Sequence, residues 1–271
     1  MTPTPRLVDI GLNLAHDSFE HDRDHVVATA RAAGVEHMVI TGSTLDSTAA
    51  AIELVRAAPE TFRCTAGVHP HHAAEMRAED VPRLRELLAS PEVGAAGECG
   101  LDHFRNFSPH EDQERAFRWQ LELAIECGKP VFLHQRDAHD AFVSILDDYL
   151  PRLPGAVAHC FTGEGRELRD YLDRGLSIGI TGWICDERRG QHLRELVRLI
   201  PLDRLMAETD APYLLPRDLS PKPAHRRNEP KYLPHVVKTI AACRGEPYAT
   251  IAAATTRNAL EFFGFGGSAS G

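Results

Sequence analysis

Side chains that can bind a divalent cation follow four short apolar runs in this 271-residue chain. The runs at 93–96, 131–133, 156–158 and 205–207 are followed by Glu98, His134, His159 and Asp210, respectively. An apolar run that stops at a carboxylate or an imidazole is typical of a buried parallel strand with a polar residue at its C-terminal end. Two histidines and two carboxylates from four separate strands suit a divalent cation of hard or borderline character. The pattern therefore predicts a metal-dependent hydrolase.

The same four residues suggest how hydrolysis would proceed. A divalent cation lowers the pKa of a bound water and neutralises charge on a phosphate or carbonyl group. Asp210 and Glu98 are the predicted catalytic residues, with Asp210 as general base towards that water. Taken singly, Glu98 could be a helix cap and each histidine a hydrogen-bonded structural residue, but their shared position after strands favours one common site.

The elements that must position these residues alternate regularly along the chain. Strands are predicted at 7–13, 37–42, 63–68, 93–98, 131–134, 156–159, 176–181 and 205–209, with helical patterns between them and two more at 234–243 and 248–263. Eight strand–helix units without a break in composition predict an α/β fold of the TIM-type (β/α)8 barrel class, as a single domain over residues 1–265 with a flexible C-terminal tail at 266–271. The C-terminal ends of all strands share one face of such a barrel, so the four ligands should converge there.

Two further segments should bring polar groups to this face. His69 and His71 follow the third predicted strand, and we expect them to contact metal or substrate, the alternative being a solvated loop. Asp9, Gly11 and Asn13 lie on one face of the first strand by alternation, which could be the barrel interior.

A basic loop follows the last predicted strand. Residues 216–232 contain five basic and two acidic side chains, although the whole chain has a formal net charge of −9. Loops at this position in barrels often bind phosphate, and the planar guanidinium group suits phosphate oxygens. Arg226 and Arg227, together with Arg136 after His134, are the predicted substrate contacts, and a solvated surface loop is the alternative. The residues that could extend this surface are Arg188 and Arg189, with Trp183 and Tyr213 as faces for base stacking.

Composition restricts the class of protein. The acidic balance argues against indiscriminate binding to nucleic acid or anionic membranes, without excluding a local basic site. No apolar stretch approaches the ~18 residues of a membrane helix, and the first residues lack the features of a signal peptide. The six cysteines form no CxxC pair, so we expect reduced thiols in a cytoplasmic monomer. Strand alternation should turn Cys99 and Cys160 away from the metal.

Six longer motifs resemble those of a known family. They are GVHPH at 67–71, GECGLD at 97–102, FLHQRDA at 132–138, HCFTG at 159–163, GITGWICDERRG at 179–190 and ETDAPYLLPRDLSPKPAHRRNEP at 208–230. Together they resemble the TatD family of metal-dependent nucleases across essentially the whole chain, and the match is close to its bacterial members. The resemblance implies a TIM barrel with magnesium-dependent 3′→5′ exonuclease activity on single-stranded DNA and RNA, and a role in DNA repair and nucleic-acid turnover.

The resemblance also assigns roles residue by residue. Glu98, His134 and His159 match the family's metal ligands, and Asp210 matches its catalytic or ligating aspartate. His69 and His71 match the histidines on the substrate side.

The chain departs from the wider superfamily at its first strand. Many members carry His-x-His there, whereas this chain has Gly11 and Asn13. The departure implies binding through oxygen ligands, with Mg²⁺ expected and Mn²⁺ as the alternative. It also argues against the main rival, an amidohydrolase-type C–N hydrolase, because those sites usually need His-x-His on strand 1 and often a carbamylated lysine where this chain has Glu98. A metal-dependent hydrolase of aminoacyl-tRNA esters and a non-catalytic nucleic-acid binder remain as alternatives.

Overall fold

Eight parallel strands run in sequence order around a barrel, each hydrogen-bonded to the next. The computed structural model describes residues 6–265. The strands are β1 (Leu7–Leu12), β2 (Val35–Ile40), β3 (Phe62–Ala66), β4 (Val93–Asp102), β5 (Val131–Arg136), β6 (Ala156–Ala158), β7 (Ser177–Ile180) and β8 (Leu205–Ala207). A parallel bridge between Leu12 and Ala211 brings the first and last strands together. The predicted barrel and its eight strands are confirmed.

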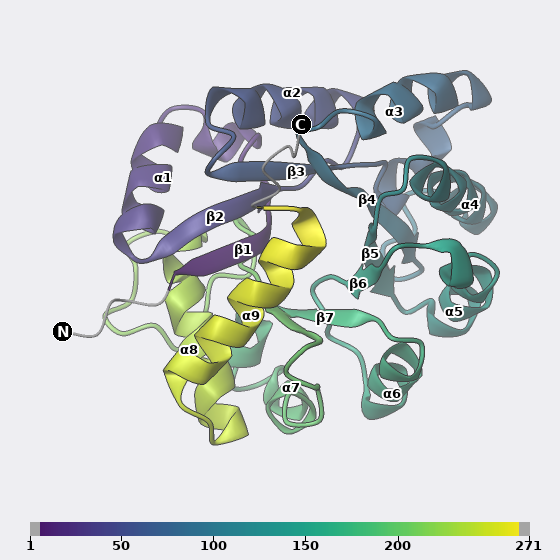
Figure 1. The fold of residues 1–271 in the computed structure, drawn as a ribbon. Coiled ribbons are helices and arrows are strands. Elements are labelled where there is room, and N and C mark those ends of the chain that lie inside the picture. The colour runs from purple at the N-terminus through teal and green to yellow at the C-terminus, as the bar shows by residue number, and fades with distance from the viewer. Residues whose placement is uncertain (1–5, 266–271) are drawn as a thin grey trace.

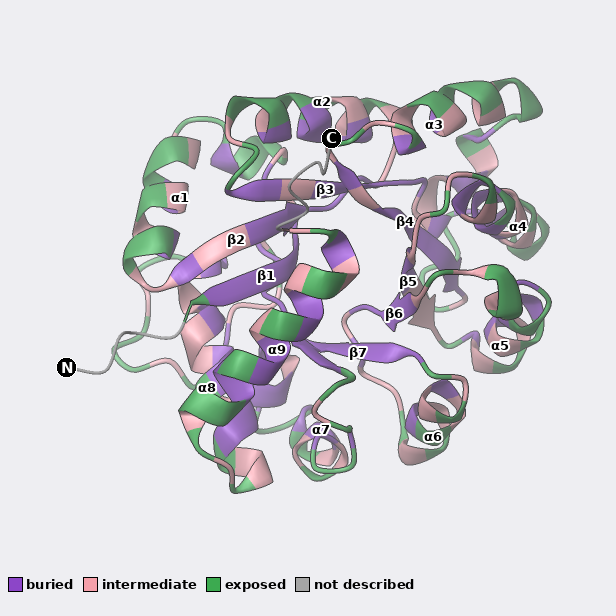
Figure 2. Cartoon of the chain, viewed as in Figure 1, coloured by how far each residue is buried: buried purple, intermediate pink, exposed green. Residues whose placement is uncertain are grey.

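Helices surround the strands on the outside of the barrel (Figure 1). They are α1 (Arg23–Ala32), α2 (Leu45–Ala57), α3 (Val81–Leu88), α4 (His110–Glu126), α5 (His139–Asp147), α6 (Gly165–Asp173), α7 (Gln191–Leu196), α8 (Leu233–Arg244) and α9 (Tyr248–Phe263). Figure 2 shows the strands almost entirely buried, while the helices carry exposed residues on their outer faces. This is the burial expected for a parallel sheet that is covered by helices.

The last helix, α9, closes the N-terminal end of the barrel. Its residues Ala259 and Phe263 join the apolar interior, in a cluster with Val8, Ile10, Val39, Ala95, Phe132, Val157 and Met206. Asn258 donates hydrogen bonds to the carbonyls of Leu202 and Leu205, where β8 begins. Figure 1 shows α9, in yellow, lying across the barrel. Because this end is filled with apolar side chains, the opposite end is left to carry the polar residues.

Two strands are longer than predicted, β5 by two residues and β4 by four. β4 continues past Glu98 to Asp102, because Gly100 and Asp102 still pair with His134 and Arg136 of β5. The register shifts between Ala96 and Cys99, so the strand bends as it passes Glu98. The extension brings Asp102 to the same end of the barrel as the predicted ligands.

Residues 1–5 of the predicted domain and the predicted tail at 266–271 lie outside the described residues. Between residues 6 and 265, no helix combines the length and apolarity needed to cross a membrane.

Candidate metal centre and basic pocket

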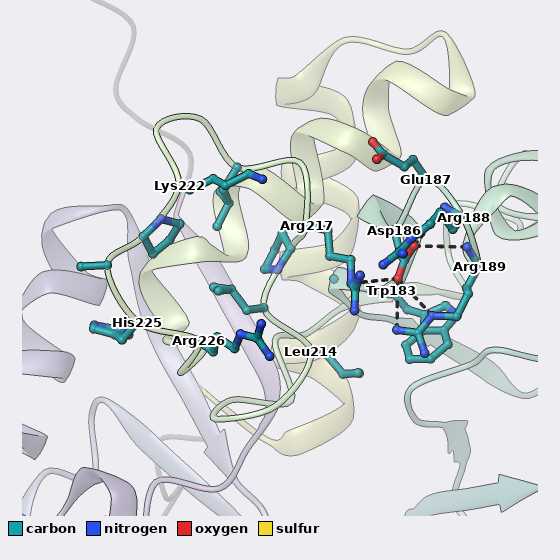
Figure 3. A pocket seen from close by; sticks show the side chains of 16 residues that line it. Trp183, Asp186, Glu187, Arg188, Arg189, Leu214, Arg217, Lys222, His225 and Arg226 are labelled. Carbon is teal, nitrogen blue, oxygen red and sulfur yellow. Dashed lines mark hydrogen bonds and ion pairs between the residues drawn. The ribbon is translucent and has the colours of Figure 1, made fainter.

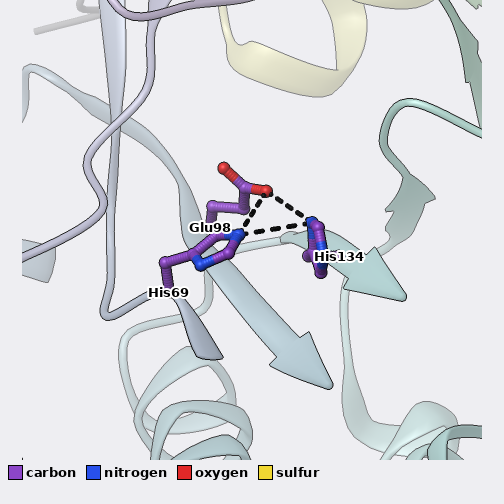
Figure 4. Close-up of side chains that lie close together, drawn as sticks. All are labelled: His69, Glu98 and His134. Carbon is purple, nitrogen blue, oxygen red and sulfur yellow. Dashed lines mark hydrogen bonds and ion pairs between the residues drawn. The ribbon is translucent and has the colours of Figure 1, made fainter. Parts of the chain in front are cut away.

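One carboxylate oxygen lies at the centre of a group of imidazoles at the C-terminal end of the barrel. Glu98 Oε1 is 2.9 Å from His134 Nδ1, 3.3 Å from His69 Nε2 and 3.5 Å from His159 Nε2. Figure 4 shows Glu98, His69 and His134 pointing towards one another from three successive segments of the barrel. Glu98 and His159 are buried, at 7% and 6% exposure. The structure therefore brings three of the four predicted ligands, Glu98, His134 and His159, into contact.

Both predicted histidine ligands are held from behind by a second carboxylate. His134 Nε2 lies 3.3 Å from Asp102 Oδ2, and His159 Nδ1 lies 2.5 Å from Glu208 Oε2. Metal-binding histidines commonly donate their second ring N–H to a carboxylate, which fixes the tautomer and the orientation of the ring. Once the nitrogen facing Glu98 loses its proton, each ring presents a lone pair that can bind a cation.

Asp210, the fourth predicted ligand, follows β8 on the same rim. Its ligand atom lies within 4.8 Å of those of His159 and Cys160. Its backbone has a φ of +54°, and its N–H donates to the Gly11 carbonyl at 2.8 Å. A non-glycine residue in this left-handed region is uncommon and is found mostly in turns and at functional sites. This backbone brings Asp210 beside His159.

His69 has the geometry of a hydrogen-bond donor. Its Nδ1 accepts the backbone N–H of His71 at 3.1 Å, which requires the proton of the neutral ring to lie on Nε2. Burial lowers the pKa of His69 to about 4, so the ring is neutral at pH 7. Although Nε2 lies close enough to Glu98 and His134 to share an ion with them, it carries the proton in this arrangement. This geometry favours the predicted role of His69 on the substrate side.

The pKa shifts of the buried side chains differ between Glu98, on β4, and the residues Asp210 and His159 across the barrel mouth. Burial raises the pKa of Glu98, but the surrounding imidazoles of His69, His159 and His134 outweigh burial and hold it well below its usual range. Burial raises the pKa of Asp210 to about 7, because the attraction of His159 is offset by repulsion from Glu98 and Glu208. Burial lowers the pKa of His159, but Glu208 and Glu98 outweigh it and raise the value to about 10. A divalent cation would supply the positive charge that Asp210 lacks.

A cavity of about 710 Å³ opens between the loops after β7 and β8 (Figure 3). Buried Asp186 accepts ion pairs from Arg189 and Arg217, each at 3.1 Å, and the Arg189 guanidinium lies 4.3 Å from the centre of the Trp183 ring. Three further basic residues line the cavity, namely Arg188, Lys222 and Arg226. No acidic side chain of residues 6–265 forms an ion pair with these three. The cavity is therefore suited to an anion.

The two neighbouring arginines of the basic loop lie in different surroundings. Arg226 lines the cavity, whereas Arg227 donates to both carboxylate oxygens of Asp22, at 2.9 and 2.6 Å, and to Glu229 at 3.0 Å. The Arg227 guanidinium also lies 5.0 Å from the centre of the Phe19 ring. These contacts tie the loop to the start of α1. They leave Arg226 as the better placed of the two predicted substrate contacts.

Comparison with known proteins places this site in a family. The sequence model of the family described as TatD related DNase matches residues 8–264. The chain is 55% identical over 258 residues to the 3′-5′ ssDNA/RNA exonuclease TatD of Citrobacter rodentium, covering 95% of this chain and 98% of that protein. It is 54% identical to the protein of the same name from Escherichia fergusonii, covering 95% and 99%. The chain belongs to the TatD-related DNase family.

Solved structures agree with this assignment. A TatD homologue from Escherichia coli K12 superposes with a TM-score of 0.86 at 26% identity, covering 96% of this chain and 98% of that one. A TatD-family hydrolase from Entamoeba histolytica gives a TM-score of 0.88 at 25% identity, covering 97% and 99%.

In this TatD-family chain, the first strand shows why no histidine stands at position 11. A Cβ atom on Gly11 would lie 2.6 Å from Glu208 Oε2 and 3.3 Å from His159 Nδ1. The Glu208 carboxylate therefore occupies the space that a side chain at position 11 would need. Asn13 Nδ2 reaches Asp210 Oδ1 at 3.4 Å, and Asp9 accepts the Thr209 N–H at 2.9 Å. The prediction of a shared interior face holds for Gly11 and Asn13 but is wrong for Asp9. Val8 and Ile10, on either side of Asp9, pack in the barrel interior, and the strand is irregular between Asp9 and Leu12.

Strand alternation predicts the position of Cys99 correctly and that of Cys160 wrongly. Cys99 packs in the core between the barrel and its helices, as predicted. The prediction for Cys160 is wrong, because its sulfur lies with the ligand atoms of His159 and Asp210. β6 ends at Ala158, and Cys160 has a φ of +46°, so the alternation of a strand no longer applies there.

Two functional residues were missed from the sequence. Glu208 is fully buried, and besides holding His159 it accepts the backbone N–H of Cys160 at 2.6 Å. Asp102 accepts hydrogen bonds from both His134 and His71, the second at 2.8 Å, and these bonds outweigh burial and hold its pKa far below the usual range. Both residues stand inside family motifs, at the ends of strands, where a carboxylate behind a histidine ligand is expected.

Proposed function

We propose that this chain is a Mg²⁺-dependent 3′–5′ exonuclease that hydrolyses phosphodiester bonds in single-stranded DNA and RNA. The observation that carries the proposal is the arrangement around Glu98 Oε1, where two histidines present one nitrogen each and are held from behind by carboxylates. Relatives more than half identical in sequence carry the name of such an exonuclease. The carboxylate and imidazole side chains fit divalent cations in general, and Mg²⁺ is the cation that we propose.

Each residue of the centre has a role in this proposal. Glu98, His134, His159 and Asp210 hold the cation, which when bound stabilises charge on a phosphoryl oxygen and lowers the pKa of water. Asp210 also accepts the proton of the attacking water, because its carboxylate lies beside His159 at the rim where that water would bind. His69, with its proton on Nε2, donates a hydrogen bond to a phosphate oxygen of the substrate.

The basic cavity binds the rest of the strand. It lies between the loops that follow β7 and β8, and β8 is also the strand that precedes Asp210. Arg226, Lys222 and Arg188 are placed to contact phosphates of the backbone, which carry little sequence information. The strand would then pass from this cavity to the metal centre, where the terminal phosphodiester is cleaved.

Rival functions use the same centre differently. Ester hydrolysis on aminoacyl-tRNA needs the same cation and water but releases an amino acid, and a non-catalytic nucleic-acid binder releases nothing. Gly11 and Asn13 in place of the first-strand histidines, with the buried Glu208 carboxylate packed against Gly11, also separate this site from the amidohydrolase type. We further propose that the protein acts as a monomer in the cytoplasm, in DNA repair and nucleic-acid turnover.

Incubation with labelled oligonucleotides tests the proposal. Single strands of DNA and RNA, labelled at the 5′ or the 3′ end, are incubated with purified protein and Mg²⁺, with and without chelator. We expect a ladder of shortened products from the 5′ label and immediate release of a mononucleotide from the 3′ label, both abolished by chelation. Release of an amino acid from charged tRNA without strand shortening would support the esterase instead, and binding without any product would support the non-catalytic protein.

A further inference from the structure

Two exposed phenylalanines stand on the loop that follows β4, beside the metal centre. Phe104 is 52% exposed and Phe107 is 67% exposed, and both come directly after Asp102. The other large hydrophobic side chains exposed within residues 6–265 are Tyr213, also at this end of the barrel, and Leu199, which follows α7 near the start of β8. Exposed apolar side chains that gather at a functional site are typical of a surface that binds a ligand or a partner.

The loop that carries these rings is anchored at both ends. Asp102 Oδ1 accepts the backbone N–H groups of Phe104 and Arg105, at 3.0 and 2.8 Å. Ser108 Oγ donates to the His71 carbonyl at 3.0 Å and accepts the N–H of Ala74 at 3.0 Å. The backbone that carries the rings is therefore held in place on the rim, which lowers the entropy cost of ordering the loop around a ligand.

The loop is in direct contact with the centre. The Phe107 ring lies 4.8 Å from the His71 ring, and the His71 ring lies 4.2 Å from the His69 ring, centre to centre. His69 Nε2 is in turn 3.3 Å from Glu98 Oε1. Two imidazoles thus connect Phe107 to the carboxylate around which the ligands gather. A group stacked on this loop would belong to the same substrate as the reacting phosphate.

Positive charge accompanies the rings. The Arg136 guanidinium carbon lies 3.8 Å from the centre of the Phe104 ring, and that of Arg105 lies 5.7 Å from it. Within the described part of the chain, no carboxylate forms an ion pair with either arginine. Aromatic faces beside guanidinium groups form the kind of surface on which single-stranded nucleic acids stack their bases and bind their phosphates.

We propose that Phe104 and Phe107 form a stacking platform for unpaired nucleobases next to the cleaved bond, with Arg105 and Arg136 binding the adjoining phosphates. The inference rests on the proposed nuclease function and names the part of the substrate that this rim recognises. Unpaired bases can separate and stack on the rings, whereas bases in a duplex are stacked and paired with each other. The platform therefore selects single strands, and it tolerates any sequence because every base has a stacking face.

Substitution of the rings combined with removal of the bases tests the platform. The variants are Phe104→Ala, Phe107→Ala, the double variant, Phe104→Trp and the matched control Leu199→Ala, which removes an equally exposed apolar side chain at the opposite end of the barrel. The substrates are a single-stranded oligonucleotide and the same strand with tetrahydrofuran abasic units at its last three 3′ positions. KM and kcat are measured with Mg²⁺, and fluorescence anisotropy with chelator present measures binding without cleavage.

We expect the double variant to bind the normal strand roughly 5- to 100-fold more weakly, the range that base–aromatic stacking produces. The loss should fall on KM, Phe104→Trp should retain binding, and Leu199→Ala should match the wild type. The abasic strand should bind the wild type as weakly as the normal strand binds the double variant, with no further loss when both changes are combined. Normal binding by the double variant, or an equal loss on normal and abasic strands, overturns the platform. If the wild type binds in this base-dependent way but releases no nucleotide, the platform stands and the nuclease proposal fails.

Discussion

The two halves of the barrel mouth handle their buried charges differently. On the side of β3 to β5, carboxylates and imidazoles alternate, and the pKa values of Glu98 and Asp102 lie well below their usual range. On the side of β8 and β1, Asp210 lies close to His159 and Glu208, and Asp9 lies close to Glu208. Burial raises the pKa of both Asp9 and Asp210 to about 7. The first half is satisfied by its own histidines, whereas the second lacks the positive charge that a bound cation would provide.

The largest loss of activity is expected from substitutions on the β3 to β5 side of the barrel mouth. Glu98→Gln keeps the shape of the side chain but removes the charge at the centre of the ligands, and His134→Ala removes a ligand. Both should lower the rate of nucleotide release by more than roughly 100-fold, beyond the loss typical of residues that only support a ligand. The melting temperature and circular dichroism spectrum should remain those of a folded barrel. Glu126→Gln, the same change at an exposed acid of α4, is the control.

Either variant turning over at the wild-type rate in saturating Mg²⁺ would show that the residue is no ligand. The cation would then have to bind at other residues of the barrel mouth.

A smaller loss of activity, which excess Mg²⁺ should reverse, is expected from substitution of Glu208 on the β8 and β1 side. Glu208→Gln keeps a hydrogen-bonding group behind His159 but removes its charge, so we expect metal affinity to fall roughly 10- to 100-fold. Because the ligands themselves remain, excess Mg²⁺ should restore most of the rate, unlike in Glu98→Gln. Calorimetric titration with the metal and rate measurements over a range of Mg²⁺ concentrations check both points. Unchanged affinity would mean that Glu208 supports only the fold.

The dependence of metal binding on pH tests the charge deficit directly. Because the pKa of Asp210 is raised to about 7, the metal-free protein holds a proton there at pH 6 and has mostly lost it at pH 8. Cation binding must displace that proton in addition to those on the histidine ligands, so affinity should rise with pH, and Asp210 alone should contribute roughly tenfold between pH 6 and pH 8. Calorimetry in buffers of different ionisation enthalpy measures the proton released. In Asp210→Asn the rise should flatten; an equal rise in that variant would assign the proton to another group.

The smallest effect separates two neighbouring residues of the second half. Arg226→Ala should raise KM for unrelated base sequences alike and lower the salt slope of binding by about one, since one phosphate contact is lost. Arg227→Ala should instead lower the melting temperature, because Asp22 loses its partner and Glu229 keeps only Lys231 and His225, at a cost of about 1–2 kcal/mol. Salt titrations of binding and thermal unfolding give the two readouts. If the Arg226 variant keeps its KM and salt slope, the strand must run along Arg188 and Arg189 instead.

The sequence allowed the convergence of the strand-end residues to be predicted because their positions depend on a simple rule. In a parallel barrel every C-terminal strand end reaches one face, so Glu98, His134, His159 and Asp210 were identifiable from the apolar runs before them. The number and order of the strands followed from the same runs.

Residues whose orientation depends on local backbone geometry could not be predicted in this way. Cys160 turns into the site because of its left-handed backbone. Asp102 reaches His71 and His134 because β4 continues past Glu98, which no break in composition indicates. Arg226 and Arg227 look alike in sequence, and only the position of Asp22, far away in the chain, separates them.

The contact between Gly11 and Glu208 limits the mutational routes open to this site. A histidine cannot enter position 11 while the Glu208 carboxylate fills the space, and a smaller residue at position 208 leaves His159 without its partner. Passage to a centre with histidines at positions 11 and 13 therefore takes changes at three positions, 11, 13 and 208. We expect the change at 11 or at 208 alone to impair the protein, so these two positions should be exchanged together.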